Sequence, residues 1–168
     1  MNRQLLLVAT TLALIAVIGA GLLAATKRVT EPAIEAELRA DRLSQLRTLI
    51  PIDQHDNQLL EDTIQIQDPT YLGTPEPVTV YRARQGGEPV GVAFEIMAPD
   101  GYNGAIKLLV AIWADGTLAG VRAVKHSETP GLGDRIETAK SDWIRQFEGH
   151  SLTSPPIENW AVKKDGGV

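Results

Sequence analysis

The hydrophobic pattern begins with an uninterrupted apolar run near the N-terminus. Residues 5–25 carry no charged side chain, and basic residues flank them at Arg3 and at Lys27-Arg28. About 20 apolar residues in a helix span a bilayer, so this run predicts one membrane-spanning helix. A cleaved signal peptide is the alternative, since Ala24-Ala25 resembles a cleavage site. The apolar core of a signal peptide is usually about 7–15 residues, however, and this one is longer.

A helical spacing of apolar residues follows the first run. Thr30-Glu31-Pro32 predicts a helix start, because threonine is a favoured cap and proline suits the first turn. The next apolar residues fall near one helical face, which Pro51 interrupts. We expect an amphipathic helix that leads from the membrane into the following domain, and then a polar loop over residues 51–61. The residues on this face are Ile34, Leu38, Leu46, Leu49 and Ile50.

Alternation of apolar and polar residues then predicts β-strands. A first strand is expected at Thr63–Gln67, and the Asp115-Gly116 pair is a strong two-residue hairpin signal. The region from Val78 to Lys125 therefore predicts a four-stranded antiparallel meander. Its strands are expected at Val78–Arg84, Val90–Met97, Ile106–Ala114 and Thr117–Lys125.

A last helix is expected after the strands. Asp134 is placed to cap it, Glu137 to complete a capping box, and Gly149 to end it. Its inward face is expected to carry Ile136, Lys140, Trp143, Ile144 and Phe147. Residues 151–168 have no regular pattern.

Separated strands and helices indicate an α+β fold, in which an N-terminal transmembrane helix precedes an antiparallel sheet with flanking helices. The expected divisions are a transmembrane anchor at residues 1–28, a linker helix and loop at residues 29–61, and a domain at residues 62–168.

Charge and composition narrow the classes of function. After residue 28 the chain holds 13 basic and 21 acidic residues, so the domain is a poor binder of nucleic acid. The absence of cysteine excludes disulfides and cysteine-ligated clusters. The three histidines lack the spacing of a metal site. More basic residues follow the apolar run than precede it, but long domains cross membranes largely regardless of local charge, so the sequence leaves the orientation open.

The loop from His126 to Asp134 is the strongest candidate for chemistry. Pro130 fixes one φ angle, and two glycines admit unusual backbone shapes and leave bare N–H groups for a flat ligand. Leu132 offers one apolar contact. With Asp134 capping the helix, a phosphate would be disfavoured there, so a nucleotide cofactor would meet this loop through its ring. The alternative is a tight strand-to-helix connector.

The other candidates have plain structural alternatives. Tyr102 could stack on a flat ring or cover the core. His126 and Glu128 could bind a cofactor, although bracing of the loop is the favoured interpretation for His126. Lys163-Lys164 is a solvated surface or a partner for a phosphate. The sequence contains no catalytic triad, P-loop or dinucleotide fingerprint, so no independent active site and no metal site are expected.

Six segments together resemble the family of G subunits of the Rnf/Rsx ion-translocating electron transport complex. The run from Glu128 to Gly133 is the most specific of them. The same FMN-binding domain occurs in the C subunit of the sodium-pumping NADH:quinone oxidoreductase. The matching segments are Gly101–Gly104, Ile106–Val110, Asp115-Gly116, His126–Asp134, Lys140–Ile144 and Trp160–Gly167.

The resemblance implies a single-pass subunit of the bacterial inner membrane with its FMN-binding domain on the periplasmic side. Its partners would be the lipid bilayer, through residues 5–25, and the other membrane subunits of the complex. It would relay electrons through FMN as one part of a translocating oxidoreductase. The residues expected at the isoalloxazine ring are Glu128, Thr129, Pro130, Gly131, Leu132 and Gly133, with Tyr102 as a stacking partner.

One feature of the family is missing. Its FMN is joined through the phosphate to a threonine in a Ser/Thr-Gly-Ala-Thr motif, which occurs nowhere in these 168 residues. We therefore expect the attachment threonine beyond Val168 and assign that role to no residue of this chain. The alternative function is a signal-anchored extracytoplasmic binding or scaffold module without a redox role.

Overall fold

The computed structural model describes residues 3–156 and 159–160. Of the Trp160–Gly167 segment, residues 161–167 lie outside the described residues. The chain divides into two compact units, Met1–Arg42 and Leu43–Val168.

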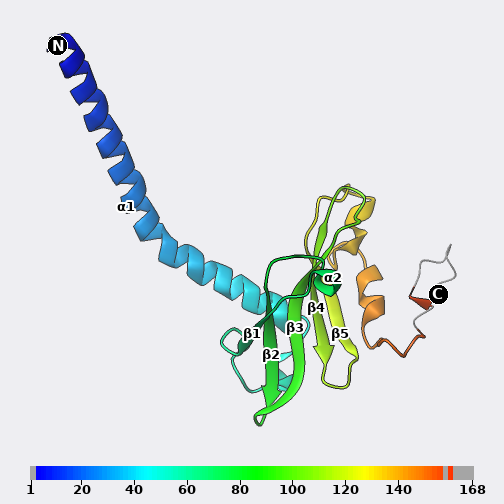
Figure 1. Cartoon of the computed structure of the whole chain (residues 1–168). Helices are drawn as coiled ribbons and strands as arrows, with labels where there is room; N and C mark the ends of the chain where they lie inside the picture. Colours follow the sequence, from blue (N-terminus) through cyan, green and yellow to red (C-terminus); the bar gives the residue numbers. More distant parts are fainter. Residues whose placement is uncertain (1–2, 157–158, 161–168) are drawn as a thin grey trace. The chain divides into compact units, whose positions relative to one another are not determined.

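The first unit is part of one long helix, α1 (Arg3–Arg47), which is long and apolar enough to cross a membrane. Its apolar side chains are exposed, as expected of a segment that faces lipid. The predicted helix start at Thr30 is wrong, because α1 continues through Pro32. The Thr30 hydroxyl donates back to the carbonyl of Thr26 at 2.9 Å instead of capping a new helix. Figure 1 shows α1 bending in its light-blue part, where a proline removes one backbone hydrogen bond.

The second unit contains a five-stranded antiparallel sheet in the order β1-β2-β3-β4-β5 (Figure 1). The predicted meander is confirmed, and β1 extends it at one edge. At the predicted Asp115-Gly116 hairpin, the Asp115 carboxylate accepts the N–H of Thr117 at 2.9 Å and Gly116 takes a φ of 85°. The strands are β1 (Thr63–Ile66), β2 (Val78–Gln85), β3 (Glu88–Ala98), β4 (Ile106–Trp113) and β5 (Leu118–Lys125).

One face of the sheet packs on the end of α1 and the segment after it. Leu46, Leu49 and Ile50 are buried there, as the amphipathic pattern predicted, whereas Ile34 and Leu38 are exposed. Small residues of the sheet allow this close approach. At Gly120 a β-carbon would lie only 2.7 Å from Cδ2 of Leu49. The remaining core residues are Leu59, Ala83, Ala93, Leu109 and Ala111.

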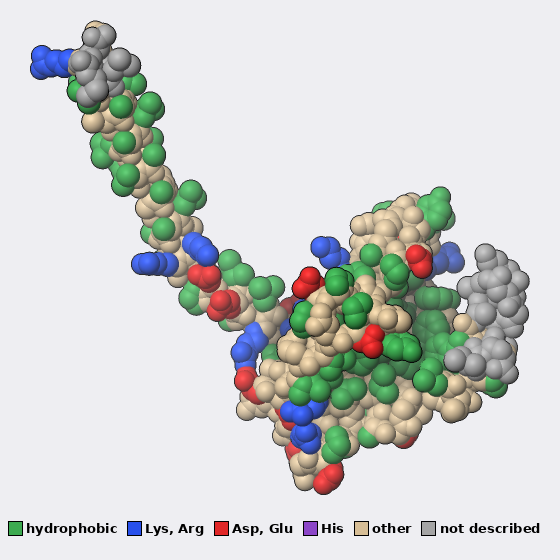
Figure 2. All heavy atoms as spheres, in the orientation of Figure 1, with side chains coloured by type: hydrophobic (Ala, Val, Ile, Leu, Met, Phe, Trp, Pro, Cys, Tyr) green, Lys and Arg blue, Asp and Glu red, His purple; other side chains and the backbone are tan. Residues whose placement is uncertain are grey.

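The alternate positions of the central strands are also apolar: Val92, Phe94 and Ile112 are half-buried, and Val110 is buried. Val92 pairs with Ile112, and Phe94 with Val110, so these side chains share the face opposite the core. Figure 2 shows hydrophobic side chains gathered over the strands in the view of Figure 1.

The predicted helix after β5 is wrong. Two short 3-10 helices stand in its place, η2 (Gly133–Ile136) and η3 (Trp143–Phe147). Asp134 caps neither, because its carboxylate turns back to the N–H of Gly131. The Ser141 hydroxyl accepts the N–H of Trp143 at 2.9 Å, so a separate turn precedes η3. Only Ile144 of the expected inward face is fully buried, and Trp143 is half exposed.

Two short elements have no counterpart in the predictions, η1 (Ile52–Gln54) and α2 (Pro69–Leu72). Asp68 caps α2 by accepting two backbone N–H groups, and Gly73 ends it with a φ of 68°. The Asp-Pro and glycine signals are therefore present in the sequence, but the helix is too short to show a periodic pattern.

Candidate functional site

Two loops meet at one end of the sheet. The first, residues 99–105, joins β3 to β4, and the second, residues 126–134, follows β5. In this antiparallel sheet β4 lies between β3 and β5. One end of the sheet therefore contains the end of β3, the start of β4 and the end of β5. We call these two segments the paired loops. All seven residues predicted to meet a cofactor lie on them.

Side-chain hydrogen bonds tie the paired loops to each other. Oε1 of Glu128 accepts the backbone N–H of Asn103 at 3.1 Å. The amide nitrogen Nδ2 of Asn103 donates to Oγ1 of Thr129 at 2.9 Å. Residues 25 and 26 positions apart in sequence are therefore joined at the site.

The second loop also holds itself in shape. The carbonyl of Thr129 accepts the N–H groups of Leu132 and Gly133, at 3.1 and 3.0 Å. Gly131 takes a φ of 80° and donates its N–H to Asp134 Oδ1 at 2.8 Å. The expectation that both glycines leave N–H groups free for a ligand is therefore wrong. Pro130 has no N–H, so within residues 128–134, all of which the structure describes, Thr129 alone has a backbone N–H without a protein partner.

The outer surface of the paired loops carries two exposed large apolar side chains. Tyr102 is 92% exposed and Leu132 is 75% exposed, while Glu128 and Gly133 are partly buried. Thr129, Pro130 and Gly131 are exposed between them. Exposed large apolar side chains beside a free backbone donor suit the edge and face of a flat heteroaromatic ring.

His126 braces the second loop. Its Nδ1 accepts the backbone N–H of Glu128 at 3.1 Å, so the ring proton is assigned to Nε2. Nε2 lies 3.3 Å from Oε1 of Glu137. Both ring nitrogens are thus used within the protein, which is the bracing role favoured for this histidine.

Asp134 braces the same loop from its other end. It is 5% exposed, and its Oδ2 lies 3.3 Å from Nζ of Lys140. The N–H of Gly131 is the main cause that lowers the pKa of the Asp134 carboxyl below its ordinary value. Burial opposes this effect, and the Lys140 ammonium adds to the lowering. The second loop therefore carries an ionised carboxylate at neutral pH.

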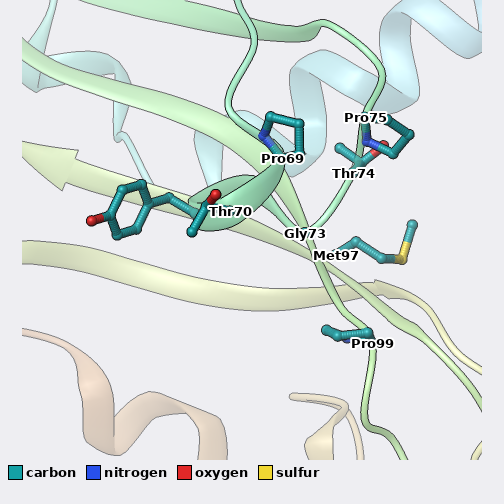
Figure 3. Close-up of a pocket in the computed structure, with 8 residues that line it drawn as sticks. Pro69, Thr70, Gly73, Thr74, Pro75, Met97 and Pro99 are labelled. Carbon is teal, nitrogen blue, oxygen red and sulfur yellow. The ribbon is translucent and has the colours of Figure 1, made fainter.

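A separate hollow lies between α2 and the end of β3 (Figure 3). Its volume is about 450 Å³, and it has no charged side chain in its lining. At Gly73 a β-carbon would lie 1.9 Å from the carbonyl oxygen of Met97, so only glycine fits there. The hollow was not predicted from the sequence. Its lining residues are Pro69, Thr70, Tyr71, Gly73, Thr74, Pro75, Met97 and Pro99.

The described residues contain no group of three or more His, Asp or Glu side chains that could hold a metal ion.

Trp143 and Trp160 pack against another aromatic side chain. Trp143 meets Phe147 edge to face, with 5.4 Å between ring centroids, and Phe147 stacks on Trp160 at 6.2 Å. The expected attachment threonine beyond Val168 lies outside the described residues, as does Lys163-Lys164.

Two family models match the chain. The RnfG N-terminal region matches residues 1–49, and the FMN-binding domain matches residues 101–167. The second match begins at Gly101, at the first of the paired loops, and includes the whole of residues 126–134.

Curated relatives match along nearly the whole chain. A protein of Shewanella loihica is 46% identical over 167 residues, which cover 99% of this chain and 79% of the relative. A Pseudomonas aeruginosa protein is 46% identical over 99% of this chain and 78% of its own length. A Vibrio atlanticus protein is 44% identical over 93% of this chain and 74% of its own length. All three are named as the G subunit of the ion-translocating oxidoreductase complex.

Proposed function

We propose that the electron relay of this chain, which belongs to the family of G subunits of ion-translocating oxidoreductase complexes, runs through an FMN whose ring lies against the paired loops. The chain carries the FMN-binding domain of that family and an apolar N-terminal helix that serves as membrane anchor. FMN supplies the chemistry when bound, since it accepts and releases electrons one at a time. The protein's part is to hold, orient and shield the ring.

The observation that carries this proposal is the exposed surface of the paired loops. Tyr102 and Leu132 can contact the ring, and the free N–H of Thr129 can donate to one of its polar edge atoms. The side chain of Tyr102 can stack because it is 92% exposed and its phenol ring has no aromatic partner among the described residues. A backbone donor at the ring edge stabilises added negative charge, which raises the affinity of the ring for an electron.

The phosphate of the flavin belongs elsewhere. Asp134 is ionised and held at the start of η2, and Glu128 and Glu137 add negative charge to the same loop region. A phosphate at this place would be repelled. This charge pattern supports the tether that the family resemblance implies, an ester to a threonine beyond Val168, which makes a tight phosphate site at the loops unnecessary.

The domain would work on the periplasmic side of the bacterial inner membrane. The anchor confines it to the membrane surface and so raises its concentration near the other subunits of the complex. Weak docking between redox partners is then enough for electron transfer. The acidic balance of the domain disfavours contact with anionic lipid head groups, which leaves the helix as its membrane contact.

Substitution of one exposed leucine tests the placement of the ring. Leu132→Asp should shift the flavin absorbance and midpoint potential of protein purified from its native membrane, because a charge would face the ring. Leu152→Asp is the matched control, since Leu152 is 76% exposed and lies away from the paired loops in sequence. Identical spectra and potentials for Leu132→Asp and wild type would refute ring contact at this loop.

A tyrosine pair tests the competing location. Tyr102→Ala should change the flavin spectrum, whereas Tyr71→Ala, at an 84% exposed residue of the α2 hollow, should not. The reverse result would move the ring to that hollow. Flavin fluorescence absent from the denatured protein band on a gel would favour a scaffold without a redox role.

A further inference from the structure

We propose that Glu128 is a positioning residue that clamps the paired loops together and so fixes the side chains that face the flavin ring. The inference rests on the proposed function and deepens it. Glu128 was expected to contact the cofactor itself, but both oxygens of its carboxylate are directed into the protein. Its effect on the flavin would then be transmitted through Tyr102 and Leu132.

The carboxylate of Glu128 sits between the two loops. Oε1 accepts the N–H of Asn103, the residue directly after Tyr102. Oε2 faces Gly133, the residue directly after Leu132. One side chain therefore accepts a hydrogen bond from the backbone next to Tyr102 and lies against the backbone next to Leu132.

Glycines on both loops make room for this carboxylate. A β-carbon at Gly133 would lie 2.7 Å from Oε2 of Glu128 and 2.8 Å from its Cβ. A β-carbon at Gly101 would lie 3.0 Å from Oε1, and 2.2 Å from the carbonyl oxygen of Gly104. Neither glycine has a left-handed φ, so space and not backbone conformation accounts for them. The two glycines thus form a slot whose occupant is Glu128.

The backbone of Glu128 is itself anchored. Its N–H donates to Nδ1 of His126, whose Nε2 lies 3.3 Å from Oε1 of Glu137. The clamp is therefore joined to the chain beyond η2 and does not move as a free side chain. The bond from Asn103 Nδ2 to Thr129 Oγ1 adds a second tie between the same loops.

Substitutions of Glu128 can separate the length of its side chain from its charge. The clamp requires only an acceptor oxygen at the right distance from the N–H of Asn103. Glu128 makes no ion pair among the described side chains, and its carboxylate accepts from a neutral N–H. Glu128→Gln keeps the reach and an acceptor oxygen but removes the charge. Glu128→Asp keeps the charge but is one methylene too short to reach Asn103. Glu128→Ala removes both.

The experiment measures two quantities in each variant of the full, flavin-loaded chain. The first is amide hydrogen exchange of peptides that cover residues 101–104, followed by mass spectrometry. The second is the flavin midpoint potential, with the absorbance spectrum. The clamp predicts exchange at Asn103 about five- to tenfold faster in Glu128→Asp and Glu128→Ala, the loss expected for one hydrogen bond, and near wild type in Glu128→Gln. The midpoint potential and absorbance spectrum of the flavin should follow the same order. Both should change in Glu128→Asp and Glu128→Ala and stay close to wild type in Glu128→Gln.

The opposite order would overturn the proposal. If Glu128→Asp resembles wild type and Glu128→Gln resembles Glu128→Ala, the charge acts on the flavin directly and the clamp is wrong. If Leu132→Asp alters the flavin but Glu128→Asp and Glu128→Ala do not, ring contact stands and the clamp falls. If Leu132→Asp also has no effect on the flavin, the proposed function falls, and the positioning role with it.

A milder variant keeps the test valid if Glu128→Ala does not fold. Asn103→Ala removes only the side-chain tie to Thr129 and leaves the N–H that Glu128 accepts. Combined with Glu128→Gln it should alter the flavin no more than Asn103→Ala alone. A larger change in the double variant would contradict a clamp that glutamine can maintain.

Discussion

Carboxylates at opposite ends of the second loop give it a shape before any cofactor is present. The Asp134 carboxylate accepts the N–H of Gly131, which has a left-handed conformation. The Glu128 carboxylate accepts the N–H of Asn103 and so joins the two loops. A site whose loops are held in this way loses little conformational freedom when a ligand binds. The exposed residues, Tyr102 and Leu132, can then have few contacts of their own and still be well placed.

The pH dependence of stability tests the role of Asp134. Its folded pKa is lowered, so the ionised carboxylate stabilises the fold above the ordinary pKa of aspartate, about 4, and this contribution is lost as the pH falls through the lowered value. Asp134→Asn can still accept from Gly131 but does not titrate. Its melting temperature should therefore fall less than that of wild type between about pH 5 and pH 3. Equal losses in thermal unfolding across this range would contradict the role given to Asp134.

At the level of residues, the sequence predicted which side chains gather at the site but not how each is used. The glycine-rich runs on both sides of β4 and β5 were visible, because glycine and proline are unambiguous in sequence. The direction of a carboxylate was not, since Asp134 could cap a helix or turn back to Gly131, and a short-range pattern does not distinguish the two. The slot for Glu128 depends on residues from two loops, which only the fold brings together.

The strands were predicted closely because their physical signals are strong. Alternation over eight or more residues and an Asp-Gly turn placed β2 to β5 to within about two residues at each end. The helical predictions failed where several local signals competed. Pro32 was predicted to lie in the first turn of a new helix, yet α1 continues through it. After β5, Asp134 and Ser141 each engage a nearby backbone N–H and leave only 3-10 turns.

The end of α1 should contribute to the stability of the sheet, whereas its middle should not. Leu46 is fully buried against the sheet, so Leu46→Ala should lower the free energy of unfolding by about 2–5 kcal/mol. Leu38→Ala is the matched control on the same helix, because Leu38 is 65% exposed. Urea unfolding of both variants measures the difference. A loss of similar size at both positions would contradict the assignment of the core.

The whole molecule combines a membrane anchor with an acidic domain, in which the exposed Tyr102 and Leu132 of the paired loops lie at one end of the sheet. The family predicted from six short segments is confirmed by relatives that match nearly the whole chain. The orientation could not be derived from the excess of basic residues after the apolar run, because long domains cross membranes largely regardless of local charge. The periplasmic side that we propose for the domain rests on the family resemblance, and site-directed labelling can test it.

The absence of cysteine makes that measurement direct. In the orientation we propose, Thr153→Cys should react with a membrane-impermeant maleimide in cells whose outer membrane has been made permeable. Gln4→Cys, on the other side of the helix, should react only after lysis. Thr153 and Gln4 are both exposed in the structure, so burial does not limit either reaction. Labelling of Gln4→Cys alone before lysis would place the domain in the cytoplasm.

The central claim is that the flavin ring lies against the paired loops. An experimental structure of the flavin-loaded protein tests it most directly. We predict atoms of the ring within about 4 Å of both the Tyr102 and the Leu132 side chains, which is contact distance. A ring bound away from both side chains, whether in the α2 hollow or elsewhere on the domain, would contradict the account.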